Sequence, residues 1–233
     1  MISNFKRKSS SFKQSLCLTL LSLLMICCLS NFYAADYDFN KLSSLANQRY
    51  GQAAYQNILE FNQMIASLKT ASDLEKLHGI NDFFNQKIKF TDDIELWGQT
   101  DYWATPLETI GKQAGDCEDF SIAKYAFLKV MNISDDKLRL TYVRAELAGN
   151  QNSAIKAHMV LSYYATPLSE PLILDNLNPE IMPASKRTDL APIFSFNSKG
   201  LWLGSSLKPK AESQTHLSRW RDVLTRIQAD GIK

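Results

Sequence analysis

Apolar residues recur every three or four positions through the first half of the chain, a pattern that predicts amphipathic helices. The first run predicts one long helix, and its apolar positions are Leu42, Leu45, Ala46, Tyr50, Ala54, Ile58, Phe61, Ile65 and Leu68. A second run extends to about Lys89. It opens with Ser72 and Glu75, which have the spacing of a capping box and so predict a helix start.

Two further helices are predicted before the pattern changes. Thr105 and Glu108 repeat the capping-box spacing, and Pro106 takes the first helical position, which predicts a short helix over 106–113. The next amphipathic run predicts a helix over 117–131.

The second half of the chain has the composition of strands, because β-branched, aromatic and leucine residues alternate with turn formers. The predicted strands are 138–147, 157–164 and 171–174, followed by a hairpin of 193–196 and 201–203. A last helix carries Leu217, Trp220, Leu224 and Ile227 and stops at Gly231. Helices first and strands later predict the α+β class, with a helical N-terminal lobe packed on an antiparallel sheet.

The N-terminus has the layout of a secretory signal peptide. Its first 15 residues include four basic ones and no acidic one, and a mostly apolar run over 16–29 follows. We predict a signal peptide over 1–35 and a mature domain over 36–233. The apolar run is short for a bilayer-spanning helix, which needs about 20 residues, so an uncleaved anchor is the less favoured alternative.

Removing the leader changes the charge and the cysteine content. It takes four of the 26 basic residues and none of the 24 acidic ones, so the formal charge falls from +2 to −2. No strongly cationic domain remains, which argues against nucleic acid as a partner. Three of the four cysteines also lie in the leader, so an exported protein would keep only Cys117. An unpaired thiol in an oxidising compartment has no disulfide to explain it.

Cys117 is therefore a candidate nucleophile. It lies at a predicted helix start, where aligned backbone N–H groups favour a thiolate. Three carboxylates, Asp116, Glu118 and Asp119, flank it and oppose that charge state. An inert buried cysteine is the alternative interpretation.

A thiol nucleophile needs a base and a group that orients the base. His78 and His216 have the sequence context of surface or helix-capping residues, whereas His158 opens a predicted strand. The next apolar strand ends at Asp175, and a separation of 17 residues is what two adjacent antiparallel strands and their turn would span. We therefore predict Cys117, His158 and Asp175 as a triad, with a structural histidine and an Asp-Asn turn as the alternatives.

Four segments together resemble the bacterial transglutaminase-like cysteine proteinases, most closely their periplasmic LapG type. The segments are Trp103 to Glu108, Gly115 to Tyr125, Lys156 to Leu161 and Leu174 to Asn176. The resemblance covers most of the chain after the leader. It implies a papain and transglutaminase-like fold, with Cys117 as nucleophile, His158 as base and Asp175 as the group that orients it.

The same resemblance implies calcium dependence, with Asp116 and Glu118 matching the acidic positions beside the family's cysteine and Asp119 adjoining them. Carboxylate oxygens are the ligands that Ca²⁺ selects. The residues alone leave open another role, in which Asp116 caps the helix and the other two acids complement its dipole. Asp101 is a further candidate ligand.

The resemblance also implies a substrate and a partner. The substrate would be a large surface adhesin, cut near its N-terminus at a di-alanine type of site, with release of the adhesin and dispersal of biofilm. The partner would be the periplasmic domain of an inner-membrane cyclic-di-GMP receptor that sequesters the protease. Two other functions stay open: acyl transfer to an amine or deamidation, because thiol chemistry is shared, and a non-catalytic binding module of the same fold.

Overall fold

The computed structural model describes residues 37–147, 154–210 and 217–232. The predicted signal peptide and His216 lie outside the described residues. Within the described part of the chain, no helix is long and apolar enough to cross a lipid bilayer.

Helices make up most of the described residues from Tyr37 to Val130, as predicted. They are α2 (Phe39–Tyr50), α3 (Gln52–Ser67), α4 (Asp73–Lys87), α5 (Asp93–Trp97), α6 (Pro106–Lys112) and α7 (Cys117–Val130), and α9 (Ser218–Ala229) follows the sheet. The capping boxes at Ser72 with Glu75 and at Thr105 with Glu108 are both present. The short helix α5 was not predicted.

The prediction of one long helix from Leu42 to Leu68 is wrong, because Gly51 divides it into α2 and α3. Gly51 has φ +83°, in the left-handed region where the absence of a Cβ removes the steric penalty. Its N–H bonds the carbonyl of Asn47 at 3.0 Å and closes α2. The apolar spacing continues unchanged on both sides of this break, so the periodicity alone could not reveal it.

The second half forms a six-stranded antiparallel sheet in the order β6-β5-β4-β3-β7-β8. The strands are β3 (Leu138–Leu147), β4 (Ala154–Tyr163), β5 (Leu172–Leu174), β6 (Met182–Pro183), β7 (Leu190–Phe196) and β8 (Leu201–Leu203). The predicted hairpin is confirmed as β7 and β8. β4 begins three residues earlier than predicted. A separate parallel pair, β1 (Lys89–Phe90) and β2 (Ala114–Gly115), was not predicted.

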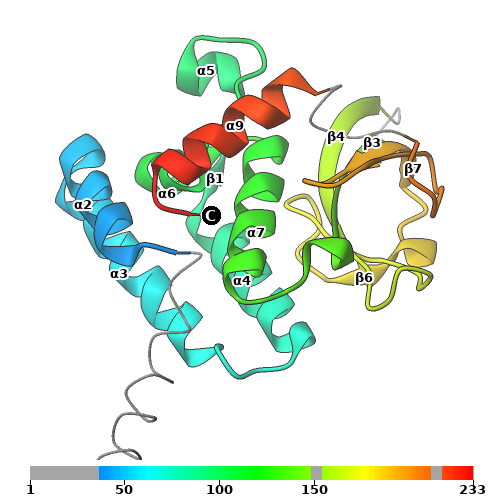
Figure 1. Ribbon diagram of the computed structural model, residues 1–233. Helices are drawn as coiled ribbons and strands as arrows, with labels where there is room; N and C mark the ends of the chain where they lie inside the picture. The colour runs from blue at the N-terminus through cyan, green and yellow to red at the C-terminus, as the bar shows by residue number, and fades with distance from the viewer. Residues whose placement is uncertain (1–36, 148–153, 211–216, 233) are drawn as a thin grey trace, which may run out of the picture. The chain divides into compact units, whose positions relative to one another are not determined.

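Helix α7 lies between the other helices and the sheet (Figure 1). Phe127 packs against Phe61 of α3 with ring centroids 4.2 Å apart, and Tyr125 packs against Trp220 of α9 at 5.3 Å. Aromatic contacts of this kind add to the area that the rings bury. The N-terminus of α7 is therefore held in a fixed place beside the sheet.

Candidate active site

The first turn of α7 holds Cys117. Asp116 precedes it in an extended conformation and caps the helix, accepting a hydrogen bond from the Glu118 N–H at 3.1 Å. Asp119 completes the box by accepting from the Asp116 N–H at 3.3 Å. A third capping box, built here from two aspartates, thus places the thiol at the first helical position.

The sheet brings His158 and Asp175 together. Leu161 of β4 pairs with Leu174 of β5, so the residue after Leu174 lies beside the part of β4 that carries His158. His158 Nε2 is 2.8 Å from Asp175 Oδ1, and both residues are buried. A carboxylate only accepts, so Nε2 carries the proton and Nδ1 is left as the basic nitrogen. The contact predicted from the spacing of 17 residues is present.

Cys117 and His158 line one cleft of about 500 Å³. Helix α7 is hydrogen-bonded to β4 at the residue after His158, because Ser121 Oγ donates to the Met159 carbonyl at 3.1 Å. The structure therefore gathers the three predicted triad residues at one place, from three different elements. It also places His78 elsewhere, on α4 and outside the residues that line the cleft.

Arg187 is a site residue that the sequence did not predict. Its Nη2 donates to Asp175 Oδ2 at 2.7 Å, and its Nε and Nη2 donate to Asp189 at 2.9 and 2.7 Å. Burial raises the pKa of Asp175, but hydrogen bonds from His158, the Leu177 N–H and Arg187 outweigh it and bring the pKa to about 2. Asp175 therefore stays ionised. Nothing in the sequence distinguishes Arg187 from the other arginines.

Lys124 supports the same region from α7. It is 1% exposed, and its Nζ donates to Asn81 Oδ1 and Asn85 Oδ1, both at 2.8 Å. Those two amides in turn donate to the carbonyls of Pro179 and Asp175 at 2.8 Å. Since Nζ donates to both amide oxygens, it fixes which end of each amide faces the loop that begins at Asp175. Helical spacing could have found Lys124, which lies two turns after Cys117.

The thiol itself lies in an acidic environment. Cys117 Sγ donates to Glu118 Oε2 at 2.7 Å, and the other oxygen of Glu118 accepts from the Tyr142 hydroxyl at 3.1 Å. Burial, followed by the charge of Glu118 and its hydrogen bond, raises the pKa of Cys117 far above its usual value. The thiol is therefore protonated at neutral pH unless the nearby negative charge is offset.

Three carboxylates form a group behind the thiol. Asp93, Asp116 and Asp119 offer oxygens that lie within 4.8 Å of one another. Burial, together with the charges of Glu118 and Asp119, raises the pKa of Asp116 to about 9. Burial likewise raises the pKa of Asp119 to about 8, although the Ala104 N–H lowers it. Glu118 belongs to a second such group, with Asp116 and Cys117.

Asp93 was missed by the sequence interpretation, and its carboxylate is incompletely bonded. Oδ2 accepts from the Tyr102 N–H at 2.5 Å, whereas the buried Oδ1 has no partner among the described residues. A buried oxygen without a partner, in a group of hard carboxylate ligands, fits a cation such as Ca²⁺. Asp101 stands outside both groups, because its carboxylate accepts from the Trp103 indole at 3.0 Å and pairs with Arg219 at 2.9 Å.

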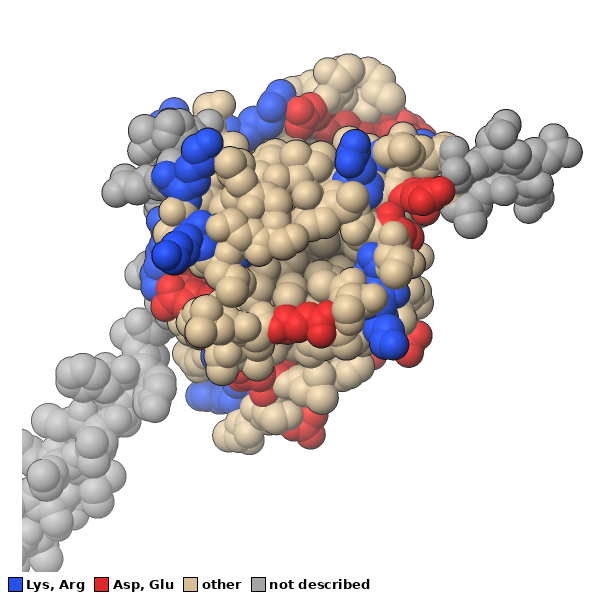
Figure 2. All heavy atoms as spheres, turned by 90° about the vertical axis from the view of Figure 1, so that its right-hand side faces the viewer, with Lys and Arg blue, Asp and Glu red and all other residues tan. Residues whose placement is uncertain are grey.

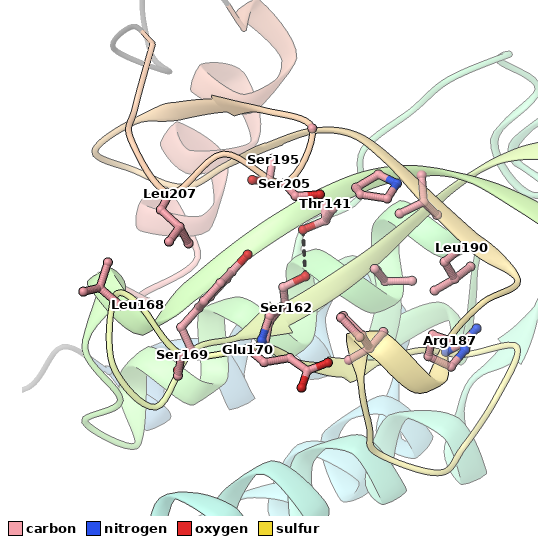
Figure 3. Close-up of a pocket in the computed structure, with 18 residues that line it drawn as sticks. Thr141, Ser162, Leu168, Ser169, Glu170, Arg187, Leu190, Ser195, Ser205 and Leu207 are labelled. Carbon is pink, nitrogen blue, oxygen red and sulfur yellow. Dashed lines mark hydrogen bonds between the residues drawn. The ribbon is translucent and has the colours of Figure 1, made fainter.

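A second cavity, of about 400 Å³, lies against another part of the sheet. Figure 3 shows Thr141 and Ser162 bonded to each other at 2.8 Å, with Leu168 and Leu207 near its edge. Viewed from the sheet side, the surface is hollowed and bordered mainly by uncharged residues (Figure 2). Its lining contains no cysteine or histidine, so the Cys117 cleft is the candidate active site.

Comparison with known proteins finds one matching family and similar solved structures. The sequence model of the bacterial transglutaminase-like cysteine proteinases matches residues 36–192. Structures of Legionella pneumophila LapG are similar to this one. An EGTA-treated form is 38% identical in sequence and superposes with a TM-score of 0.70, and the match covers 82% of this chain and 97% of the LapG chain. A calcium-bound form has 38% identity and a TM-score of 0.68 and covers 82% and 99%. A comparison with the curated proteins finds no match.

Proposed function

The chain belongs to the bacterial transglutaminase-like cysteine proteinases, and from this premise we propose that Cys117, His158 and Asp175 are its catalytic triad. The observation that carries the proposal is the 2.8 Å bond between His158 and Asp175 in the cleft that also contains Cys117. Membership of the family makes the protein a cysteine proteinase, and the proposal assigns the roles within it.

The proposed reaction uses the two nitrogens of His158 differently. Nε2 donates to Asp175, and Nδ1 removes the proton from Cys117 as the sulfur attacks the scissile carbonyl carbon. The proton then passes from Nδ1 to the leaving amine as the C–N bond breaks, which leaves an acyl-enzyme. A water molecule that gives a proton to Nδ1 attacks the thioester, and the C–S bond then breaks as Nδ1 returns that proton to the sulfur, which releases the acid and restores the starting enzyme. Arg187 keeps Asp175 ionised and in position throughout.

The proposal includes a calcium ion at Asp93, Asp116 and Asp119, with Glu118 beside it. Support comes from the unpartnered oxygen of Asp93, from the mutual crowding of the carboxyls, and from the calcium-bound LapG structure. Bound there, the ion would supply positive charge that offsets the carboxylates. The chain's own contribution is a helix start held by a capping box, in which Asp116 and Asp119 precede and follow Cys117 in the sequence and belong to the same group of carboxylates.

The substrate and setting proposed here follow from the likeness to the LapG type. We propose cleavage of a large surface adhesin near its N-terminus, which would release the adhesin and promote biofilm dispersal. The protease would act in the periplasm after removal of residues 1–35, and the periplasmic domain of an inner-membrane cyclic-di-GMP receptor would restrain it. Sequencing the N-terminus of the exported protein tests the location, and recovery of the intact leader in membranes would contradict it.

The central experiment incubates the purified protein with a large adhesin encoded nearby. We expect one cut in calcium and none in excess EGTA. Cys117→Ala and His158→Ala should each abolish cleavage while the thermal unfolding midpoint stays near that of the wild type. Full activity in Cys117→Ala would refute the assignment of the nucleophile. A fluorescent primary amine included in the assay distinguishes hydrolysis from transamidation, because only transamidation attaches the amine to protein.

A further inference from the structure

Strand β4 continues well past its partner β5, and this leaves one of its edges free. β5 pairs with β4 only at the three positions from Leu161 to Tyr163. β3 follows β4 over its whole length on the other side, down to Ala154. Among the described residues, no strand or isolated bridge pairs with the first half of β4 on the β5 side. Residues Ala154 to Ala157 are exposed there.

The hydrogen bonds of Met159 show which backbone groups face this edge. Its carbonyl accepts from Ser121 of α7. On the β3 side, the Tyr164 N–H donates to the Lys137 carbonyl at 2.7 Å, so Tyr164, Ser162 and Val160 face β3, which leaves the N–H and the carbonyl of Met159 on the opposite side. Both groups therefore point away from β3. Alternate residues of an antiparallel strand point their backbone groups to the same side, so Ile155 and Ala157 also present an N–H and a carbonyl to the free edge.

The free edge leads directly to the nucleophile. The Met159 carbonyl bonds Ser121, one helical turn after Cys117, and Ala157, two residues before Met159, lines the same cleft as Cys117. Apolar side chains that are about half exposed, Phe90, Ile94 and Leu177, line the cleft as well. A sheet edge offers main-chain affinity to an extended peptide, and neighbouring pockets take its side chains.

We propose that the protein binds its substrate as an added β-strand along the β4 edge at Ile155 and Ala157, which brings the scissile carbonyl to Cys117. The inference rests on the proposed function of Cys117 and names the substrate class: an extended segment of polypeptide without hydrogen-bonded partners, recognised largely through its main chain. A segment held in a helix or an intact sheet cannot offer these groups and is not cut. Unpaired linkers between folded domains are the sites available to the enzyme.

The test measures how fast two reagents alkylate Cys117 in the calcium-loaded protein. The first is acetyl-tetraalanine chloromethyl ketone, whose peptide can occupy the edge, and the second is iodoacetamide, which has no peptide. A series of tetraalanine reagents replaces one amide at a time by an ester, removing a single N–H. We expect the rate to fall about 3- to 10-fold at every second position and to change little between them, as loss of one hydrogen bond predicts.

A protein variant provides the second arm. Ile155→Pro removes an N–H that has no strand partner among the described residues, a change that edge strands tolerate, and Ile155→Val is the matched control that retains the N–H. We expect the ratio of the peptide rate to the iodoacetamide rate to fall about 3- to 10-fold in Ile155→Pro alone. If that variant does not fold, the ester series with the wild-type protein still decides.

The outcomes separate the two proposals. If neither reagent labels Cys117, the proposed nucleophile is wrong. If both reagents label it but the ester series lacks a period of two, strand addition is wrong and the protease assignment stands. A change of oligomeric state in Ile155→Pro with an unchanged ratio of rates would instead assign the edge to a second copy of the chain, which also overturns the inference.

Discussion

The three clustered carboxylates Asp93, Asp116 and Asp119, which lie near Cys117, make the stability of the calcium-free protein depend on pH. In the unfolded chain Asp116 and Asp119 ionise near the ordinary value of 3.8, whereas in the folded chain their pKa values are about 9 and about 8. Between these limits the folded state binds more protons than the unfolded state. The free energy of unfolding therefore falls as pH rises from about 4 to about 8, the reverse of the usual behaviour of a paired aspartate.

The magnitude follows from the same values. Each such carboxyl lowers the free energy of unfolding by about 1.4 kcal/mol per pH unit, so two of them would cost about 5 kcal/mol from pH 5 to pH 7. Because the two carboxyls repel each other, their titrations are coupled and their effects do not simply add. We therefore expect the free energy of unfolding to fall by about 2–3 kcal/mol between pH 5 and pH 7. For a domain of this size that is roughly 5–10 °C in the unfolding midpoint.

The assay is thermal unfolding at pH 5 and pH 7, in EGTA and in millimolar CaCl₂. We expect the EGTA midpoint to be lower at pH 7, and calcium to remove the difference. Asp116→Asn keeps a good helix cap but loses the charge, so it should flatten the pH dependence in EGTA and weaken the response to calcium. Asp136→Asn, at an exposed surface pair, is the control. Equal EGTA midpoints at pH 5 and pH 7 in the wild type would refute the reasoning.

Three further predictions concern single side chains around the triad. Arg187→Met should lower kcat about 10- to 100-fold with little change in KM, because Asp175 loses a charge-assisted hydrogen bond. Arg187→Lys should recover part of the loss, and an unchanged kcat in Arg187→Met would contradict this role. Glu118→Gln should speed alkylation of Cys117 by iodoacetamide at pH 7 in EGTA, since it removes the charge that most raises the thiol pKa, and an unchanged rate would show that burial alone controls it. Lys124→Met should lower the unfolding midpoint by roughly 2–12 °C, because the side-chain oxygens of the buried Asn81 and the half-buried Asn85 lose their donor, at about 1–3 kcal/mol in total. A wild-type midpoint would mean that those amides find other partners.

The sequence determined the features of this protein that depend on near neighbours along the chain. Capping boxes at Ser72 and Thr105 marked helix starts because a cap bonds backbone groups only three residues away. The position of Cys117 at the start of a helix is local in the same sense. Even the contact between His158 and Asp175 was within reach, because two antiparallel strands that follow each other in the sequence commonly pair, and their spacing then limits which residues lie opposite.

Tertiary structure decided what depends on residues brought together from distant parts of the chain. Asp93 and Arg187 have no spacing relation to the motifs that they serve, and only packing places one behind the thiol and the other against Asp175. The break at Gly51 also escaped prediction, because a helix hairpin can keep the same apolar period on both arms. The free edge of β4 exists because β4 is longer than β5, and the sequence of neither strand alone indicates this. Local bonding fixed where the nucleophile sits in the chain, and long-range packing fixed which charges and which open edge surround it.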